Sequence, residues 1–214
     1  MSNTIEDLNL KGADLRNGTF KNVDFVNTNL EGADLRGSTL IGCCLKGLNL
    51  KGARFDDCTI EDVDFTGSDL TGATFDKAKF HEPIMVGCSL RGVKLNQTVF
   101  NGGSFIRSTI MGVDFTRIVY DFEGSESDCV NGYLQDPRLL FNGSDLTGAK
   151  FDGLNLTHAQ FEGSDLTGAS FKGCDLSSTP EDYFYHSEGT NFKDAILEGS
   201  IFDGAKTKGA LGLS

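Results

Sequence analysis

Large apolar residues recur every five positions along most of the chain. From Leu10 to Tyr120 each fifth residue is Leu, Phe, Ile, Met or Tyr, and the spacing returns at 141–176 and 192–202. A small or compact residue commonly stands two positions earlier, and the residues between are mostly polar. A period of five fits neither the helical repeat of about 3.6 residues nor the strand repeat of about two. The pattern therefore predicts a chain that turns every five residues, with two residues of each unit facing a core.

Glycine marks every fourth unit of this repeat. Two positions after Leu10, and at every twentieth residue from there, stand Gly12, Gly32, Gly52, Gly72, Gly92 and Gly112. Because glycine readily adopts the left-handed backbone that tight corners need, this spacing predicts four units, and so four faces, in each coil. We number the faces 1 to 4, starting from the face that is centred on Leu10. The 34 clear units then make about eight to nine coils.

Two interruptions break the five-residue phase. Phe141 follows Tyr120 by 21 residues, and Phe192 follows Leu176 by 16, where five are due. If both phenylalanines lie on face 4, the glycine corner resumes after each break in its old position. This register predicts two insertions that leave the coils at the same corner, between faces 3 and 4.

A single domain, 1–214, is expected to contain all of these segments. The coils are predicted over 8–122, 139–178 and 190–206, and the insertions over about 123–138 and 179–189. A competing register would treat 121–140 as a distorted coil. That register would bury Ser125 and Gln135 as centres of the core, so the insertion is the better interpretation.

The repeated units resemble those of the pentapeptide-repeat family. GADLR, GSDLT and GATFD are typical of that family, and the resemblance covers about residues 8–206. It implies an all-β fold, the right-handed quadrilateral β-helix, and says little about function. Some members of the family are acidic proteins that resemble duplex DNA. Those members bind DNA gyrase or topoisomerase IV and protect the enzyme from quinolones or toxins.

Charge narrows the range of partners. The chain has 214 residues and a formal net charge of −12, which argues against nucleic acid as a direct ligand because phosphate binding depends on Lys and Arg. No apolar run approaches the roughly 20 residues of a membrane span. The start, MSNTIEDLNLKG, lacks the basic and apolar regions of a signal peptide. These features predict a cytoplasmic protein that binds neither nucleic acid nor membrane.

Cysteines and histidines are the residues that could bind a metal. Four cysteines take the inward small position, one an outward position and one the first insertion: Cys43, Cys58, Cys88, Cys174, Cys44 and Cys129. The inward ones are expected to be small buried residues of the core, and the scattered histidines to be lone surface residues. Neither a C-x-x-C pair nor a nucleophile elbow or P-loop occurs. We therefore expect no catalytic, cofactor-binding or metal site, no cofactor, and no enzymatic activity.

The insertions are the best candidates for function, because loops on a rigid scaffold commonly carry it. Their sequences are EGSESDCVNGYLQDPR and TPEDYFYHSEG, and the second begins with a Thr-Pro-Glu-Asp run that is typical of a helix start. Aromatic residues among acidic ones suit a recognition patch. The alternative is that the rings pack onto face 3 or 4 or onto the first insertion. The candidate partner-binding residues are Glu123, Glu126, Asp128, Tyr133, Asp136, Glu181, Asp182, Tyr183, Phe184 and Tyr185.

The sequence thus favours a non-enzymatic, acidic scaffold that binds a protein partner through its insertions. The alternative, implied by the family resemblance, is a DNA mimic that binds DNA gyrase or topoisomerase IV and protects it from quinolones or toxins. The tail after Gly204, AKTKGALGLS, is short and partly apolar. It could either cap the coils or join a second chain, which would give a homodimer through one end of the rod.

Overall fold

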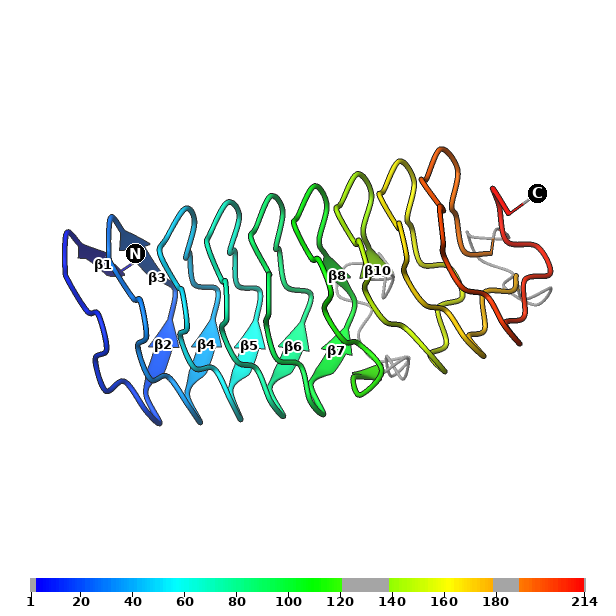
Figure 1. Ribbon diagram of the computed structural model, residues 1–214. Coiled ribbons are helices and arrows are strands. Elements are labelled where there is room, and N and C mark those ends of the chain that lie inside the picture. The colour runs from blue at the N-terminus through cyan, green and yellow to red at the C-terminus, as the bar shows by residue number, and fades with distance from the viewer. Residues whose placement is uncertain (1–2, 121–138, 179–188, 214) are drawn as a thin grey trace, which may run out of the picture.

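A computed structural model describes residues 3–120, 139–178 and 189–213, which form a right-handed, four-sided β-helix with its coils stacked in one row (Figure 1). All strand pairs and bridges in these residues are parallel. Six strands form the sheet of face 3: β2 (Thr19–Lys21), β4 (Thr39–Ile41), β5 (Thr59–Glu61), β6 (Lys79–His81), β7 (Val99–Asn101) and β9 (Val119–Tyr120). Four lie on face 4: β1 (Asn3–Glu6), β3 (Val23–Val26), β8 (Gly103–Ser104) and β10 (Leu139–Leu140).

Residues twenty apart are partners in the ladders, which confirms four units per coil. Asn9 pairs with Asn29 and Asp14 with Asp34. The ladder on face 1 has nine rungs: Asn9, Asn29, Asn49, Asp69, Ser89, Thr109, Asp145, Asp165 and Ile196. Face 4 has one rung more, because it begins with Ile5 opposite Phe25 and ends with Leu211 opposite Asn191. The number of coils is therefore slightly above the eight to nine that the sequence predicts, since both ends of the chain continue the ladders.

The ladders also confirm where the two breaks lie. Gly103 pairs with Leu139 across the first break, and Gln160 pairs with Asn191 across the second. Both pairs lie on face 4, and the last units before the breaks lie on face 3. Both breaks therefore occur at the corner between faces 3 and 4. The competing register with a distorted coil is wrong, because Leu139 pairs directly with Gly103, which leaves no place in the stack for a coil between them.

Backbone conformation explains the glycine corner. Gly72 has a φ of 70°, in the left-handed region, and a Cβ added to it would meet nothing within 4 Å. Conformation, and not lack of space, therefore selects glycine here. The other corners also contain residues with side chains in this conformation, such as Asn22 and Lys77.

Small polar residues on the inward positions join neighbouring coils. The Ser108 hydroxyl donates a hydrogen bond to the Met85 carbonyl of the preceding coil and accepts one from the Cys88 N–H at 3.0 Å. The buried Cys58 and Cys174 thiols donate in the same way, at 2.9 and 3.0 Å, to backbone carbonyls of preceding coils. Inward Ser, Thr and Cys thus add hydrogen bonds between coils. Among the described residues the Met85 carbonyl has no turn N–H as a donor and accepts only from Ser108, whereas the carbonyls bonded by Cys58 and Cys174 also accept from a turn N–H of their own coil.

Stacked phenylalanines fill the later coils. Phe115, Phe151 and Phe171 stack on face 2 with ring centroids 4.9 and 5.0 Å apart. On face 4, Phe141 stacks on Phe161 at 5.1 Å. Rings of the two faces meet edge to face. This geometry favours the ring quadrupoles, so the core gains more than the burial of apolar area alone.

The stacked asparagines of face 1 form hydrogen bonds within their own coils. Asn9, Asn29 and Asn49 do stack, but each side-chain oxygen accepts a hydrogen bond from the backbone N–H two residues later in its own coil, at 3.1 to 3.3 Å. These oxygens bond within their own coil because the nearby corner N–H is a close donor. The described residues contain no helix that is long and apolar enough to span a membrane.

Candidate functional site

The corner between faces 3 and 4 is the edge on which the expected site lies. Its corner residues in successive coils are Asn22, Gly42, Asp62, Glu82 and Gly102, all with φ between 48° and 67°. The first break follows one coil later, after Tyr120. We call this row of corners, together with the two breaks in it, the insertion edge.

The predicted partner-binding residues fall outside the described part of the chain. None of Glu123, Glu126, Asp128, Tyr133, Asp136, Glu181, Asp182, Tyr183, Phe184 and Tyr185 belongs to it, and the expected helix start at 179–182 does not either. The structure therefore fixes the edge from which these segments leave, and the role of the residues stays a prediction.

Most of the net negative charge belongs to these two segments. Residues 121–138 and 179–188 contain eight acidic residues and one basic residue, a net charge of −7 out of the −12 of the chain. The rest of the chain therefore has a net charge of only −5, spread over its remaining residues. Three of the four tyrosines of the chain, Tyr133, Tyr183 and Tyr185, also lie in these segments.

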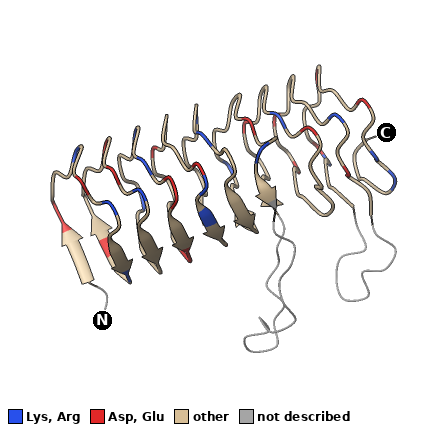
Figure 2. Cartoon of the chain, turned by 90° about the horizontal axis from the view of Figure 1, so that it is seen from below, with Lys and Arg blue, Asp and Glu red and all other residues tan. Residues whose placement is uncertain are grey.

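Acidic residues alternate with basic ones along the coils (Figure 2). On face 2, Arg16 contacts Asp14 at 2.7 Å and Arg36 contacts Asp34 at 2.6 Å. The hydrogen bond from Arg16 lowers the pKa of Asp14 to about 2. Along the face 2 ladder, Arg54, Thr74 and Lys94 follow these aspartates, and no face has a ladder made only of carboxylates in the described coils. The coils thus present a mixed surface.

One mixed cluster of a histidine and carboxylates lies on the insertion edge. Asp62, His81 and Glu82 each offer one ligand atom, and these atoms lie within 4.8 Å of one another. Sequence reasoning missed this cluster because it looked for ligands a few residues apart, whereas stacking joins positions twenty apart. His158, expected on the surface, is only 8% exposed, so that expectation is wrong. The repeat assigns a position within the coil but does not determine what covers that position.

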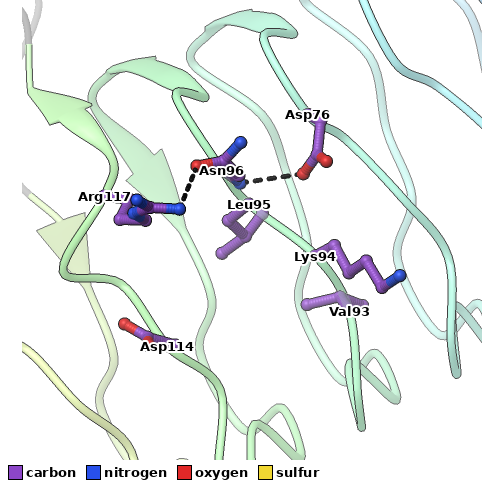
Figure 3. Close-up of a pocket in the computed structure, with 7 residues that line it drawn as sticks. All are labelled: Asp76, Val93, Lys94, Leu95, Asn96, Asp114 and Arg117. Atoms are coloured by element: carbon purple, nitrogen blue, oxygen red, sulfur yellow. Dashed lines mark hydrogen bonds between the residues drawn. The ribbon is translucent and has the colours of Figure 1, made fainter.

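A shallow depression on the corner between faces 2 and 3 is another feature of the described residues that could hold a ligand. Seven residues line it: Asp76, Val93, Lys94, Leu95, Asn96, Asp114 and Arg117 (Figure 3). The Asn96 N–H donates to the Asp76 carboxylate at 2.9 Å, and Arg117 donates to the Asn96 side chain at 3.2 Å. Its volume of about 210 Å³ is below the roughly 300–1,000 Å³ of most ligand pockets. Its size does not match a small-molecule site.

The inward cysteines are buried, as the sequence predicts. Cys43, Cys58, Cys88 and Cys174 are at most 2% exposed, and the described cysteines form no disulfide. Burial raises the pKa of the Cys58 thiol to about 12 and that of Cys88 and Cys174 to about 11. These thiols are therefore protonated near neutral pH and act as hydrogen-bond donors in the core.

The stacked four-sided coils place the chain in the class of β-helical repeat proteins, in which each coil contacts only its neighbours. The family is equally clear from the sequence. Residues 9–47, 49–82 and 141–179 match the family described as pentapeptide repeats, in eight copies. The chain belongs to the pentapeptide-repeat family, as the repeated units predicted. No curated protein matches the sequence.

A solved structure of another pentapeptide-repeat protein shares the architecture. HetL, a protein involved in heterocyst differentiation regulation from the cyanobacterium Nostoc sp. strain PCC 7120, is 21% identical. The match covers 97% of this chain and 84% of HetL, with a TM-score of 0.62. The plasmid-mediated fluoroquinolone resistance protein QnrB1 is 18% identical over 96% of this chain and 91% of its own, with a TM-score of 0.49. At 21% identity the likeness to HetL shows the fold alone.

Proposed function

We propose that this protein is a non-enzymatic scaffold that binds a protein partner with a basic surface through the segments that leave its insertion edge. The observation that carries the proposal is the charge distribution. The segments 121–138 and 179–188 hold a net charge of −7, and they begin at the same corner of a rigid stack. The cytoplasmic location stays a prediction within this proposal.

Two further features support the insertion edge as the recognition surface. Tyrosine supplies a large contact area with only two side-chain rotations to restrict, and it is enriched at interfaces. Acidic side chains beside it favour encounter with a basic partner and select against acidic ones. The coils lack the second feature, since their acidic and basic side chains are interspersed.

Site-specific photo-crosslinking in cells of the source organism tests the proposal. A photoreactive amino acid replaces Tyr133 or Tyr183 in the full chain, and the matched control carries it at Lys150 on face 2. We expect both tyrosine positions, but not Lys150, to crosslink the same protein. Replacing Glu123, Glu126 and Asp128 by their amides should reduce the crosslink at Tyr133. Equal crosslinking from Lys150 would contradict the proposal, as would an undiminished crosslink after the charges are removed.

DNA mimicry with binding to DNA gyrase or topoisomerase IV is the alternative. The net charge of −12 supports it, but the mixed ladders of the described coils do not, because a mimic of duplex DNA needs continuous negative charge along the rod. A gyrase supercoiling assay with ciprofloxacin, at increasing amounts of the full chain, decides between the two. Protection or inhibition would favour the mimic, and unchanged supercoiling at micromolar protein would exclude it for gyrase.

A homodimer through one end of the rod is a separate proposal. Ile196 and Leu211 are 54% and 38% exposed near the C-terminal end of the stack, so a second chain could cover them. Light scattering across a range of concentrations tests it, with Ile196→Asp as the variant expected to be monomeric. A wild-type chain that stays monomeric at high concentration would rule the dimer out.

A further inference from the structure

Stacking brings a histidine and two carboxylates of neighbouring coils together on the insertion edge. Asp62 occupies the corner of one coil, while His81 ends β6 and Glu82 occupies the corner of the next coil. The Asp62 N–H donates a hydrogen bond to the His81 carbonyl at 3.3 Å, which holds the two coils in register here. One ligand atom from each of the three side chains lies within 4.8 Å of the other two.

The imidazole of this cluster has an unsatisfied nitrogen. His81 Nδ1 is buried and has no hydrogen-bond partner in the described part of the chain, although buried polar atoms nearly always have one. A ligand bound to the imidazole would satisfy this nitrogen.

We infer that Asp62, His81 and Glu82 bind a divalent transition-metal ion of the Zn²⁺ type. Imidazole suits zinc and its neighbours and does not suit Ca²⁺ or Mg²⁺, which prefer oxygen ligands alone. Ligand atoms about 2 Å from a tetrahedral zinc ion stand roughly 3.3 Å apart. The separations here are within reach of that arrangement, because Asp62 is exposed and its side chain can rotate. Water would complete the coordination.

A metal ion at this place would clamp two neighbouring coils. It would bind one coil through Asp62 and the next coil through His81 and Glu82. The first insertion leaves from the same edge, further along the stack. It would also neutralise two carboxylates that stacking brings together. The inference concerns the coils alone and does not depend on the proposed protein partner.

Titration of the metal-free full chain with ZnCl₂, followed by calorimetry, tests the site. We expect one ion per chain and a rise in the midpoint of thermal unfolding, because a ligand that binds only the folded state stabilises it. Loss of an outer-shell partner alone weakens metal binding by about 10–100-fold, so loss of a ligand in His81→Gln should weaken it by at least about tenfold. Asp57→Asn is the matched control, because Asp57 is an exposed corner aspartate with a φ of 60°, and it should bind like the wild type.

Cobalt distinguishes this site from binding by cysteines. The Co²⁺ complex of the full chain should show the weak visible bands of nitrogen and oxygen ligands, without the intense near-ultraviolet band of a thiolate ligand. If His81→Gln does not fold, Asp62→Asn provides the same comparison, because that side chain is exposed. Absence of binding, a thiolate band, or equal affinity in the variants and the control would overturn the inference.

Discussion

The hydroxyl of Ser108 offers a sharp test of how the coils are joined. Ser108 is 1% exposed, and its hydroxyl donates to the Met85 carbonyl and accepts from the Cys88 N–H at 3.0 Å. In Ser108→Ala both backbone groups lose this partner inside the core. An unsatisfied buried group costs about 1–3 kcal/mol.

The neighbouring corners show how the chain can limit this loss. Ala73 takes the same place relative to Ala53 that Ser108 takes relative to Cys88, but it has no hydroxyl. In that coil the Ala53 N–H donates to the Leu50 carbonyl of its own turn, at 3.0 Å. If the Cys88 N–H of the alanine variant donates to the Met85 carbonyl in the same way, one hydrogen bond is regained, but the backbone must shift to form it. We therefore expect Ser108→Ala to lower the free energy of unfolding by about 1–3 kcal/mol in total.

Equilibrium unfolding in urea, followed by circular dichroism, measures this change. The control is Ser108→Cys, because the Cys88 thiol already makes such a bond to the Phe65 carbonyl at 3.0 Å one coil earlier. The cysteine variant should lose less than the alanine variant. If Ser108→Ala unfolds within about 0.3 kcal/mol of the wild type, the hydroxyl is not needed and the reasoning about buried carbonyls fails.

Three further changes test the corner, the core and the thiols. Gly72→Ala should cost about 0.5–1.5 kcal/mol from its left-handed conformation alone, and Gly72→Asn less; equal losses in urea unfolding would contradict a conformational cause. Leu95→Phe should raise the free energy of unfolding by about 0.5–1.5 kcal/mol, because its ring would continue the face 2 stack from Phe75. A lower midpoint of thermal unfolding would show that the space around Leu95 is too small for the ring. In a Cys129→Ser background, mass mapping should find Cys44 labelled by a thiol reagent well before Cys58, whose burial raises its pKa to about 12; similar rates would contradict the buried position.

Much of the fold follows from the order of residues, because each coil contacts only its neighbours. Large residues at every fifth position and Gly12, Gly32 and their successors at every twentieth determine the faces and corners. Since the backbone conformation of a corner is a local property, the glycine spacing also locates the breaks after Tyr120 and Leu176. The inward cysteines follow from the same repeat.

The tertiary structure decided what the repeat leaves open. Stacking places Asp62 beside His81 and Glu82, and a five-residue pattern read along the chain does not search for ligands one coil apart. It also decided that the oxygens of Asn9, Asn29 and Asn49 bond to their own corners, because competition between nearby donors depends on distances in space. The repeat thus determines where each residue lies within a coil, while contacts across coils determine which side chains can act together.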